Sequence, residues 1–323
     1  MTAVSKSARR RIKRLALLAD VAEMYFIQNM TQSAIARRID TTPSNVSRMI
    51  TDCQRLGIVK ITISRPTARD DALSDALIKA YGLTDARAVV VGEQTDGVVP
   101  RDVASAGATL LREMLLPGCS VGITWGRTLL AVLREFGEPI DNGGSVVQLA
   151  GSIGATREEH DSLSLVQRLS AAINARPVYF SAPFIVESEA IAASLVKNTS
   201  NALAQQLSKR CDVIIAGIGT LDPVNGSLLA SGHVSAADAT RILNAKAVGE
   251  ICGHPINAAG DLAEPAFSRR LMSIQPRHLK TAPVRIAVAS RPAVLAPLKA
   301  ALRKGYVTHL VVDTALATAL LEK

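Results

Sequence analysis

The chain has 323 residues, of which 48% are hydrophobic, 20% charged and 3% aromatic. This composition excludes a disordered or fibrous protein, and the length exceeds the usual size of one domain, so we expect a small and a larger domain. No run of about 18 uncharged apolar residues occurs, and no signal-type apolar segment follows the basic N-terminus, so we expect a cytoplasmic protein that does not enter the membrane.

Positive charge is concentrated near the N-terminus. Residues 1–65 hold 12 Lys or Arg against 4 Asp or Glu, whereas residues 66–323 hold 25 against 24. A local basic excess is expected where a protein contacts phosphates. The alternative from charge alone is a solvated basic tail.

The cysteines give little support to a metal site. Cys53, Cys119, Cys211 and Cys252 are far apart, and none belongs to a CxxC pair or a histidine cluster. We therefore expect no metal and no cofactor, and interpret the cysteines as buried apolar thiols.

A first helix is predicted over residues 11–28, because apolar residues recur there at three- and four-residue steps. The residues of this face are Leu15, Leu18, Ala19, Ala22 and Phe26. Arg9, Arg10 and Arg11 precede or open the helix, where positive charge opposes the helix dipole. This placement indicates a phosphate partner rather than helix stability.

Two shorter helices follow. Thr31 is a candidate N-cap for a helix over residues 32–39, and Thr42 is a second N-cap, with Pro43 at the first helical position. A short helix, a tight turn and a second helix predict a helix-turn-helix, whose second helix enters the major groove.

The polar face of the second helix has the chemistry of base recognition. Arg48 can read guanine and Asn45 adenine bidentately, while Ser44 and Ser47 can reach bases or phosphates. The alternative is an ordinary helical hairpin with a solvated polar face. The residues expected to contact DNA are Arg9, Arg10, Arg11, Gln32, Thr42, Ser44, Asn45, Ser47 and Arg48.

A wing is expected directly after this helix. Gly57 ends the helix, and residues 58–63 alternate apolar and polar side chains until Pro66. Alternation of this kind predicts a strand. Residues 1–65 are therefore predicted to form a winged helix-turn-helix that binds DNA, and residues 66–323 the effector-binding domain.

The rest of the chain reads as an α/β domain. After a predicted helix over residues 70–81, seven short apolar runs alternate with helical stretches, which indicates a mainly parallel, Rossmann-like sheet covered on both faces. The runs are residues 86–91, 120–124, 145–149, 177–180, 212–216, 285–289 and 309–312. Ligands bind such sheets at the carboxyl ends of the strands.

Those predicted strand ends are rich in glycine and hydroxyl groups, and a helix is expected to begin near Thr128, so backbone amides and a helix N-terminus can meet an anion or a sugar. The expected effector-binding residues from this pattern are Gly122, Thr124, Trp125, Gly126, Arg127, Thr128, Gly151, Ser152, Gly217 and Gly219. Trp125 can close over a ligand or serve packing. A dinucleotide fingerprint fails at Asp222, and no P-loop, GxSxG or HExxH motif occurs.

The order of these motifs resembles the SorC family of sugar-binding transcriptional regulators, of the DeoR/SorC type, across nearly the whole chain. The matching segments are residues 122–128, Gly217-Ile-Gly219, Gly249-Glu-Ile-Cys-Gly253 and residues 301–313. The resemblance implies a phosphosugar-isomerase-like effector domain, commonly a tetramer, with residues 122–128 as the phosphate-side loop. It also implies that the protein binds double-stranded operator DNA.

Two positions depart from the family's pattern. Val294 stands where the family commonly has a lysine, with Arg291 and Lys299 nearby. Asn257 replaces an aspartate, and the resemblance makes it a further expected effector-binding residue with changed hydroxyl recognition. An unphosphorylated sugar or polyol is therefore an alternative to a sugar phosphate. We expect a homo-oligomer that regulates a carbohydrate or polyol operon and is not an enzyme. The rival is a sugar-phosphate isomerase-like enzyme with a basic appendage.

Overall fold

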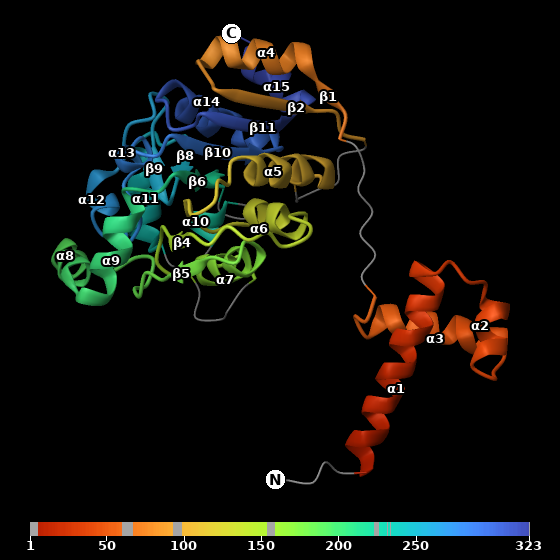
Figure 1. Ribbon diagram of the computed structural model, residues 1–323. Coiled ribbons are helices and arrows are strands. Elements are labelled where there is room, and N and C mark those ends of the chain that lie inside the picture. Colours follow the sequence, from red (N-terminus) through yellow and green to blue (C-terminus); the bar gives the residue numbers. More distant parts are fainter. Residues whose placement is uncertain are drawn as a thin grey trace. The chain divides into compact units, whose positions relative to one another are not determined.

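The computed structural model describes residues 6–59, 67–92, 99–153, 159–222, 226–230, 232 and 234–322. The chain divides into two compact units, residues 1–65 and residues 66–323 (Figure 1). Within the described residues no helix is long and apolar enough to cross a membrane.

Unit 1 is helical. Its elements are α1 (Lys6–Ala22), the π-helical turn η1 (Glu23–Ile27), α2 (Gln32–Arg38) and α3 (Pro43–Arg55). The hydroxyl of Thr31 accepts from the Ala34 N–H at 3.2 Å, and that of Thr42 from the Asn45 N–H at 3.3 Å. Both predicted N-caps are therefore present, and each satisfies one of the N–H groups that a helix start leaves unpaired.

The core of unit 1 joins all of its helices. Buried apolar side chains from α1, η1, α2 and α3 form it: Leu18, Val21, Ala22, Met24, Ile35, Ala36, Val46, Ile50 and Cys53. The predicted face of the first helix is partly wrong, because Leu15 and Ala19 are exposed whereas Val21 and Met24 are buried. The other helices pack on the side of α1 that carries Leu18, Val21 and Ala22, and Leu15 and Ala19 lie off that side.

The predicted wing strand falls mostly outside the described residues. Ile58 and Val59 leave α3 as a bend, and residues 60–66 are not described. Gly57, at a φ of +70°, follows α3 in the left-handed conformation that suits glycine.

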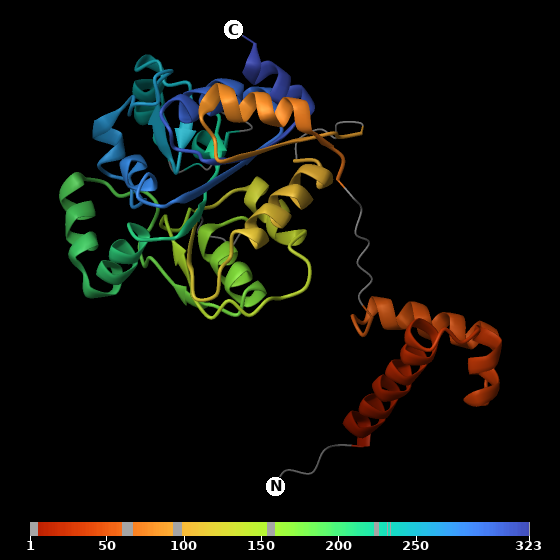
Figure 2. The ribbon, with the colours of Figure 1, turned by 45° about the horizontal axis from the view of Figure 1, so that its top comes forward.

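Unit 2 is built on an eight-stranded sheet (Figures 1 and 2). Its strands, in spatial order, are β1 (Arg69–Asp70), β2 (Asp85–Val89), β11 (His309–Asp313), β10 (Val284–Ala289), β6 (Val213–Ile215), β3 (Ser120–Ile123), β4 (Ser145–Gln148) and β5 (Arg176–Val178). All neighbours pair in parallel except β1 and β2. The prediction of a mainly parallel α/β sheet is confirmed, and all seven predicted runs supply its parallel strands.

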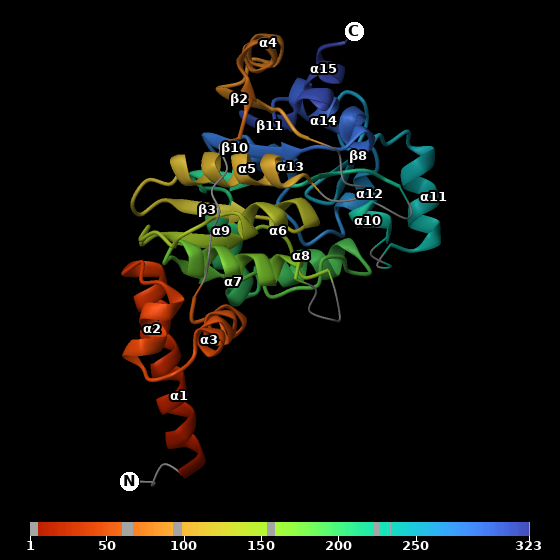
Figure 3. The same cartoon turned by 90° about the vertical axis from the view of Figure 1, so that its right-hand side faces the viewer.

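Helices cover both faces of this sheet, so unit 2 has three layers. The helices of the unit are α4 (Asp71–Tyr81), α5 (Arg101–Glu113), α6 (Arg127–Arg134), α7 (Ser162–Ala172), α8 (Glu189–Lys197), α9 (Thr199–Ser208), α10 (Ser227–Ala230), α11 (Ala236–Asn244), α12 (Pro265–Ser268), α13 (Pro276–Leu279), η2 (Pro292–Val294), α14 (Leu295–Arg303) and α15 (Thr314–Leu321). The helices α5, α6 and α7 lie on one face (Figure 3), and their apolar side chains pack against the sheet. Those of α4, α9, α14 and α15 pack on the other.

A second, antiparallel sheet was not predicted. It consists of β7 (Ile218–Gly219), β8 (Gly249–Ile251) and β9 (His254–Ile256). The tip of the β8–β9 hairpin is Cys252-Gly253, and both residues have positive φ, at +53° and +81°. This is the backbone of a two-residue type I′ turn, in which a non-glycine residue is strained.

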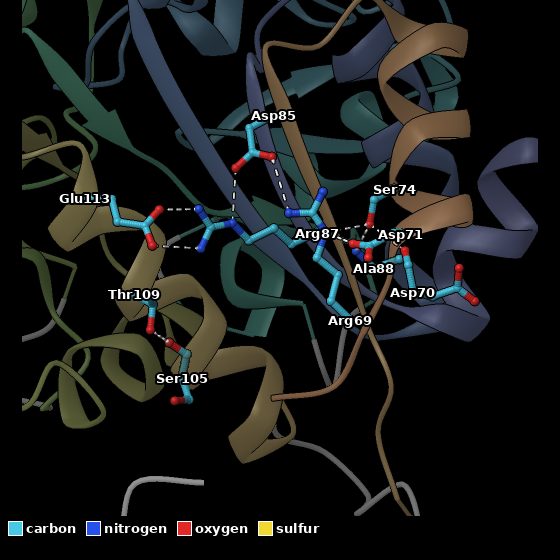
Figure 4. Close-up of polar contacts among 10 residues, drawn as sticks. All are labelled: Arg69, Asp70, Asp71, Ser74, Asp85, Arg87, Ala88, Ser105, Thr109 and Glu113. Atoms are coloured by element: carbon cyan, nitrogen blue, oxygen red, sulfur yellow. Dashed lines mark hydrogen bonds and ion pairs between the residues drawn. The ribbon is translucent and has the colours of Figure 1, made fainter. Parts of the chain in front are cut away.

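Polar contacts fix the point where the chain enters unit 2 (Figure 4). The Ser74 hydroxyl donates to the Asp70 carbonyl at 2.6 Å and accepts from the Ala88 N–H at 3.0 Å and from Arg69 Nε at 3.2 Å. One buried hydroxyl thus ties α4 to β1 and β2. The edge strand β1 is held by side chains as well as by its short backbone pairing.

Candidate functional site

The topology of the large sheet indicates where a ligand binds. From β3 the chain runs outward through β4 to β5, and from β6 it runs in the opposite direction through β10 to β11. The strand order therefore reverses between β3 and β6, and a crevice opens at the carboxyl ends of two such strands. A small cleft of about 50 Å³ lies there, at the place where ligands bind sheets of this topology.

The first wall of the cleft is the segment between β3 and α6. Thr124 to Thr128 all border the cleft, and the buried Thr124 hydroxyl accepts from the Gly217 N–H at 3.2 Å. Gly126 opens α6 at a φ of +131° and gives it no side-chain cap. The amide N–H groups at the start of α6 are thus not occupied by a capping side chain, which suits an anion or a hydroxyl oxygen.

The second wall comes from the antiparallel sheet. Gly217 and Gly219, two of the residues expected to bind effector, border the cleft together with Glu250 and Cys252. Glu250 is buried, and its carboxylate accepts from the Gly253 N–H at 2.6 Å. A Cβ atom on Gly219 would lie 2.1 Å from Glu250 Oε1, so glycine is needed for this close approach.

Two arginines bring positive charge to the cleft. Arg127 begins α6 and Arg291 follows β10, and both border the cleft. Burial lowers the pKa of Arg291, the nearby Arg127 lowers it further, and Asp222 opposes the shift. Both guanidinium groups therefore belong to one cleft, with the Asp222 carboxylate as a nearby negative charge.

Trp125 is 4% exposed and takes the packing role between the two walls. Its ring meets Phe184 edge-on at 4.7 Å between centroids. A Cβ atom on Gly253 would lie 2.9 Å from the indole, so the hairpin tip packs directly on this ring. Trp125 also borders the cleft, and it therefore connects the ligand-facing loop with the hairpin.

Four expected effector residues do not border the cleft. Gly122 faces Leu149, Gly151 donates to the Met272 carbonyl at 2.7 Å, and Ser152 forms a bridge with Pro183. The Asn257 side chain accepts from the N–H groups of Ala259 and Asp261, at 2.9 and 3.1 Å, and so stabilises its own turn. The structure gives these positions packing and turn roles.

Sequence reasoning missed Glu250, Cys252 and Arg291. Arg291 lies two residues beyond the predicted strand over residues 285–289. Because ligands bind at the carboxyl ends of parallel strands, the sequence could have identified it as a site residue. Glu250 lies on a three-residue strand within the segment of residues 249–253, which matches the family pattern but is not among the residues expected to bind effector. Val294 is 4% exposed in the core, and Lys299 donates to the Glu322 carbonyl at 2.6 Å.

In unit 1, the polar face of α3 is open to solvent. Ser44, Asn45, Ser47 and Arg48 are exposed, while Val46 is buried on the opposite face. The Asn45 amide nitrogen donates to the Thr41 hydroxyl at 2.9 Å. Of the other expected DNA contacts, Arg11 and Thr42 are exposed, Gln32 is partly buried at the start of α2, and Arg9 and Arg10 belong to α1.

Comparisons with known proteins agree with this architecture. The chain is 28% identical over 304 residues to the erythritol catabolism regulatory protein EryD of Brucella abortus, covering 93% of this chain and 94% of that protein. It is 24% identical over 304 residues to the deoxyribonucleoside regulator of Bacillus subtilis, covering 94% and 96%. The full-length sorbitol operon regulator SorC of Klebsiella pneumoniae has a similar fold, with a TM-score of 0.71, 22% identity and coverage of 96% and 100%.

The family comparison concerns unit 2. A model described as "Putative sugar-binding domain" matches residues 65–322, and the resemblance to SorC-type regulators is confirmed. The match covers most of the chain, including both walls of the cleft. The chain therefore belongs to this family of sugar-binding domains.

Proposed function

We propose that the chain is a transcriptional regulator of a carbohydrate or polyol operon, whose affinity for operator DNA is controlled by a small effector bound in the cleft of unit 2. The observation that carries the proposal is the cleft at the strand reversal, lined by hydroxyl groups, glycines and two arginines. Relatives over the full chain are named as regulators, which supports control of transcription rather than catalysis.

Unit 1 is the proposed DNA-binding domain, a winged helix-turn-helix with α3 as the recognition helix. Its net positive charge supplies phosphate contacts, and its exposed Ser44, Asn45, Ser47 and Arg48 supply base contacts. The partner is double-stranded operator DNA in the cytoplasm. A homo-oligomer, dimer or tetramer, would place two recognition helices on two half-sites.

Unit 2 is the proposed effector domain, similar to phosphosugar isomerases in arrangement. Hydroxyl groups of a sugar or polyol fit Thr124, Thr128 and the Glu250 carboxylate, and an anionic end fits Arg127 and Arg291. By linkage, the effector shifts DNA affinity only if it binds the DNA-competent and incompetent states differently.

DNA recognition is tested by salt-titrated binding to a sequence selected from a random duplex pool and to an unselected duplex. Arg48→Ala should cost about 1–3 kcal/mol of discrimination between the two duplexes. The triple change of Arg9, Arg10 and Arg11 to alanine should weaken binding to both and lower the slope of log affinity against log salt. Parent-like behaviour of both variants would overturn the DNA-binding assignment.

Effector binding is tested by thermal shift with a panel of sugars, polyols and their phosphates. A true effector at about 100 times its Kd adds about 2.7 kcal/mol to the free energy of unfolding. The same compound must then change the Kd for the selected duplex. A compound that is chemically converted, as followed by NMR, would instead support the isomerase-like enzyme.

A further inference from the structure

Helix α1 carries an apolar stripe on its solvent side. Ile12 and Leu15 are 60% and 38% exposed, and Ala16 and Ala19 are also exposed. These four residues share one face because they lie at i, i+3, i+4 and i+7. Leu18 and Val21, which pack in the core of unit 1, lie on a different side of the helix.

Charge is divided sharply along the same helix. The basic residues of its first half are Lys6, Arg9, Arg10, Arg11, Lys13 and Arg14, whereas Asp20 lies in its last turn and Glu23 opens η1. Within the described part of unit 1 the ion pairs join Arg14 and Arg55 to Asp52 and do not use Asp20 or Glu23. This order of charges opposes the dipole of the helix itself, so helix stability does not explain it.

We propose that α1 pairs with α1 of a second copy of the chain, antiparallel and across a two-fold axis beside Ala16. In this arrangement Ile12 packs against Ala19 of the second copy, and Lys13 lies level with Asp20 of the second copy. A parallel pair would instead place the two basic halves side by side, which repels. The charge order is therefore self-complementary only in the antiparallel arrangement, as an isologous contact requires.

The size of the residues fits a close contact. Ala16 and Ala19 present only methyl groups where the helices approach, and Ile12 and Leu15 fill the space on either side. One helix pair buries little surface, so it is a weak contact that gains from any other contact between copies. Pairing of this kind brings two α3 helices together before DNA is bound, and it goes beyond the proposed effector control.

The test is disulfide crosslinking of the full chain without DNA, after Ala16→Cys. A disulfide requires Cα atoms within about 4–7 Å, which only residues beside the two-fold axis satisfy. The matched control is Leu17→Cys, which is exposed on the same helix but off the stripe. We expect the Ala16→Cys chain to form covalent dimers about tenfold faster than the control, because proximity sets the rate of exchange.

Charge reversal tests the orientation. Lys13→Glu in the Ala16→Cys chain should slow dimer formation about fivefold, because the two-fold axis places a repulsion between the introduced glutamate and Asp20 on both sides of the contact. Adding Asp20→Lys should restore the rate, because both pairs are then of opposite charge again. Equal rates at positions 16 and 17, no dimer at either, or no response to both charge changes would each overturn the proposal. Because the assay contains no DNA, its failure is distinguishable from a failure of operator binding or effector control.

Discussion

Acidification should destabilise unit 2 through one buried histidine. His254 on β9 is fully buried, and its ring nitrogens lie near the backbone of Ser273 and Ile274 without a hydrogen bond of good geometry. Desolvation lowers the pKa of His254 from 6.5 to about 4, against a smaller opposing effect of the backbone at Ile274 and Ser273. The ring is therefore neutral in the native state over a pH range in which the unfolded chain binds a proton.

The sign and size of the effect follow from this difference. Above pH 6.5 the ring is neutral in both states and the full stability is present; as pH falls toward 4 only the unfolded state gains the proton, so stability is lost. At about 1.4 kcal/mol per pKa unit, the lowering from 6.5 to about 4 amounts to about 3 kcal/mol once the pH is below 4. This is a large fraction of the stability of a domain.

Urea unfolding at pH 7.5 and pH 4.5 measures this loss of stability in unit 2. Trp125 is the only tryptophan and lies in unit 2, so its fluorescence reports the unfolding of that unit. The loss of stability between the two pH values should be smaller in His254→Leu than in the parent by about 2–3 kcal/mol. His278→Leu is the control, because the pKa of the partly buried His278 is lowered less. Equal pH dependence of His254→Leu and the parent would refute the reasoning.

Three further substitutions test the cleft and α3, the proposed recognition helix. In isothermal titration, Arg291→Gln should weaken the binding of anionic effectors about tenfold or more and leave the binding of uncharged effectors unchanged. The control Lys299→Gln should change the affinity for neither class of effector. Gly219→Ala should lower the melting temperature and abolish effector binding, because its Cβ atom would meet the buried carboxylate of β8 at 2.1 Å; Gly217→Ala, whose nearest contact is 3.3 Å, should be milder. Thr42→Ala should speed amide hydrogen exchange in the first turn of α3, since a lost N-cap costs about 1 kcal/mol; unchanged exchange would contradict the capping role.

The elements that sequence predicted well are those coded locally. Thr31, Thr42 and Asp70 start helices through side-chain contacts three residues away, which a sequence displays directly. The parallel strands are buried on both faces and so read as continuous apolar runs. The antiparallel sheet escaped prediction because its strands are two or three residues long and depend on pairing between distant segments.

The candidate site divides in the same way. The segment from Thr124 to Thr128 was predicted because one strand end and one helix start are adjacent in sequence. Glu250 and Arg291 join it from elements more than a hundred residues away, and only the folded sheet brings them there. The face of α1 was misjudged because a periodic pattern does not show which apolar residues the rest of a small domain is large enough to cover.

The position of Arg291 also bears on the effector. Val294, where the resembled family commonly has a lysine, ends the 3₁₀ turn η2 and is packed in the core, so it supplies no charge. Arg291 comes just before that turn and brings a guanidinium to the cleft from the same strand end. With Arg127 it gives the cleft two cations opposite one buried carboxylate. A ligand with an anionic group at one end and hydroxyl donors at the other interacts with both the arginines and the carboxylate, whereas a neutral polyol makes no ion pair with the arginines. The chemistry of the cleft therefore favours a sugar phosphate or sugar acid over an uncharged polyol, and the Arg291→Gln titration decides between them.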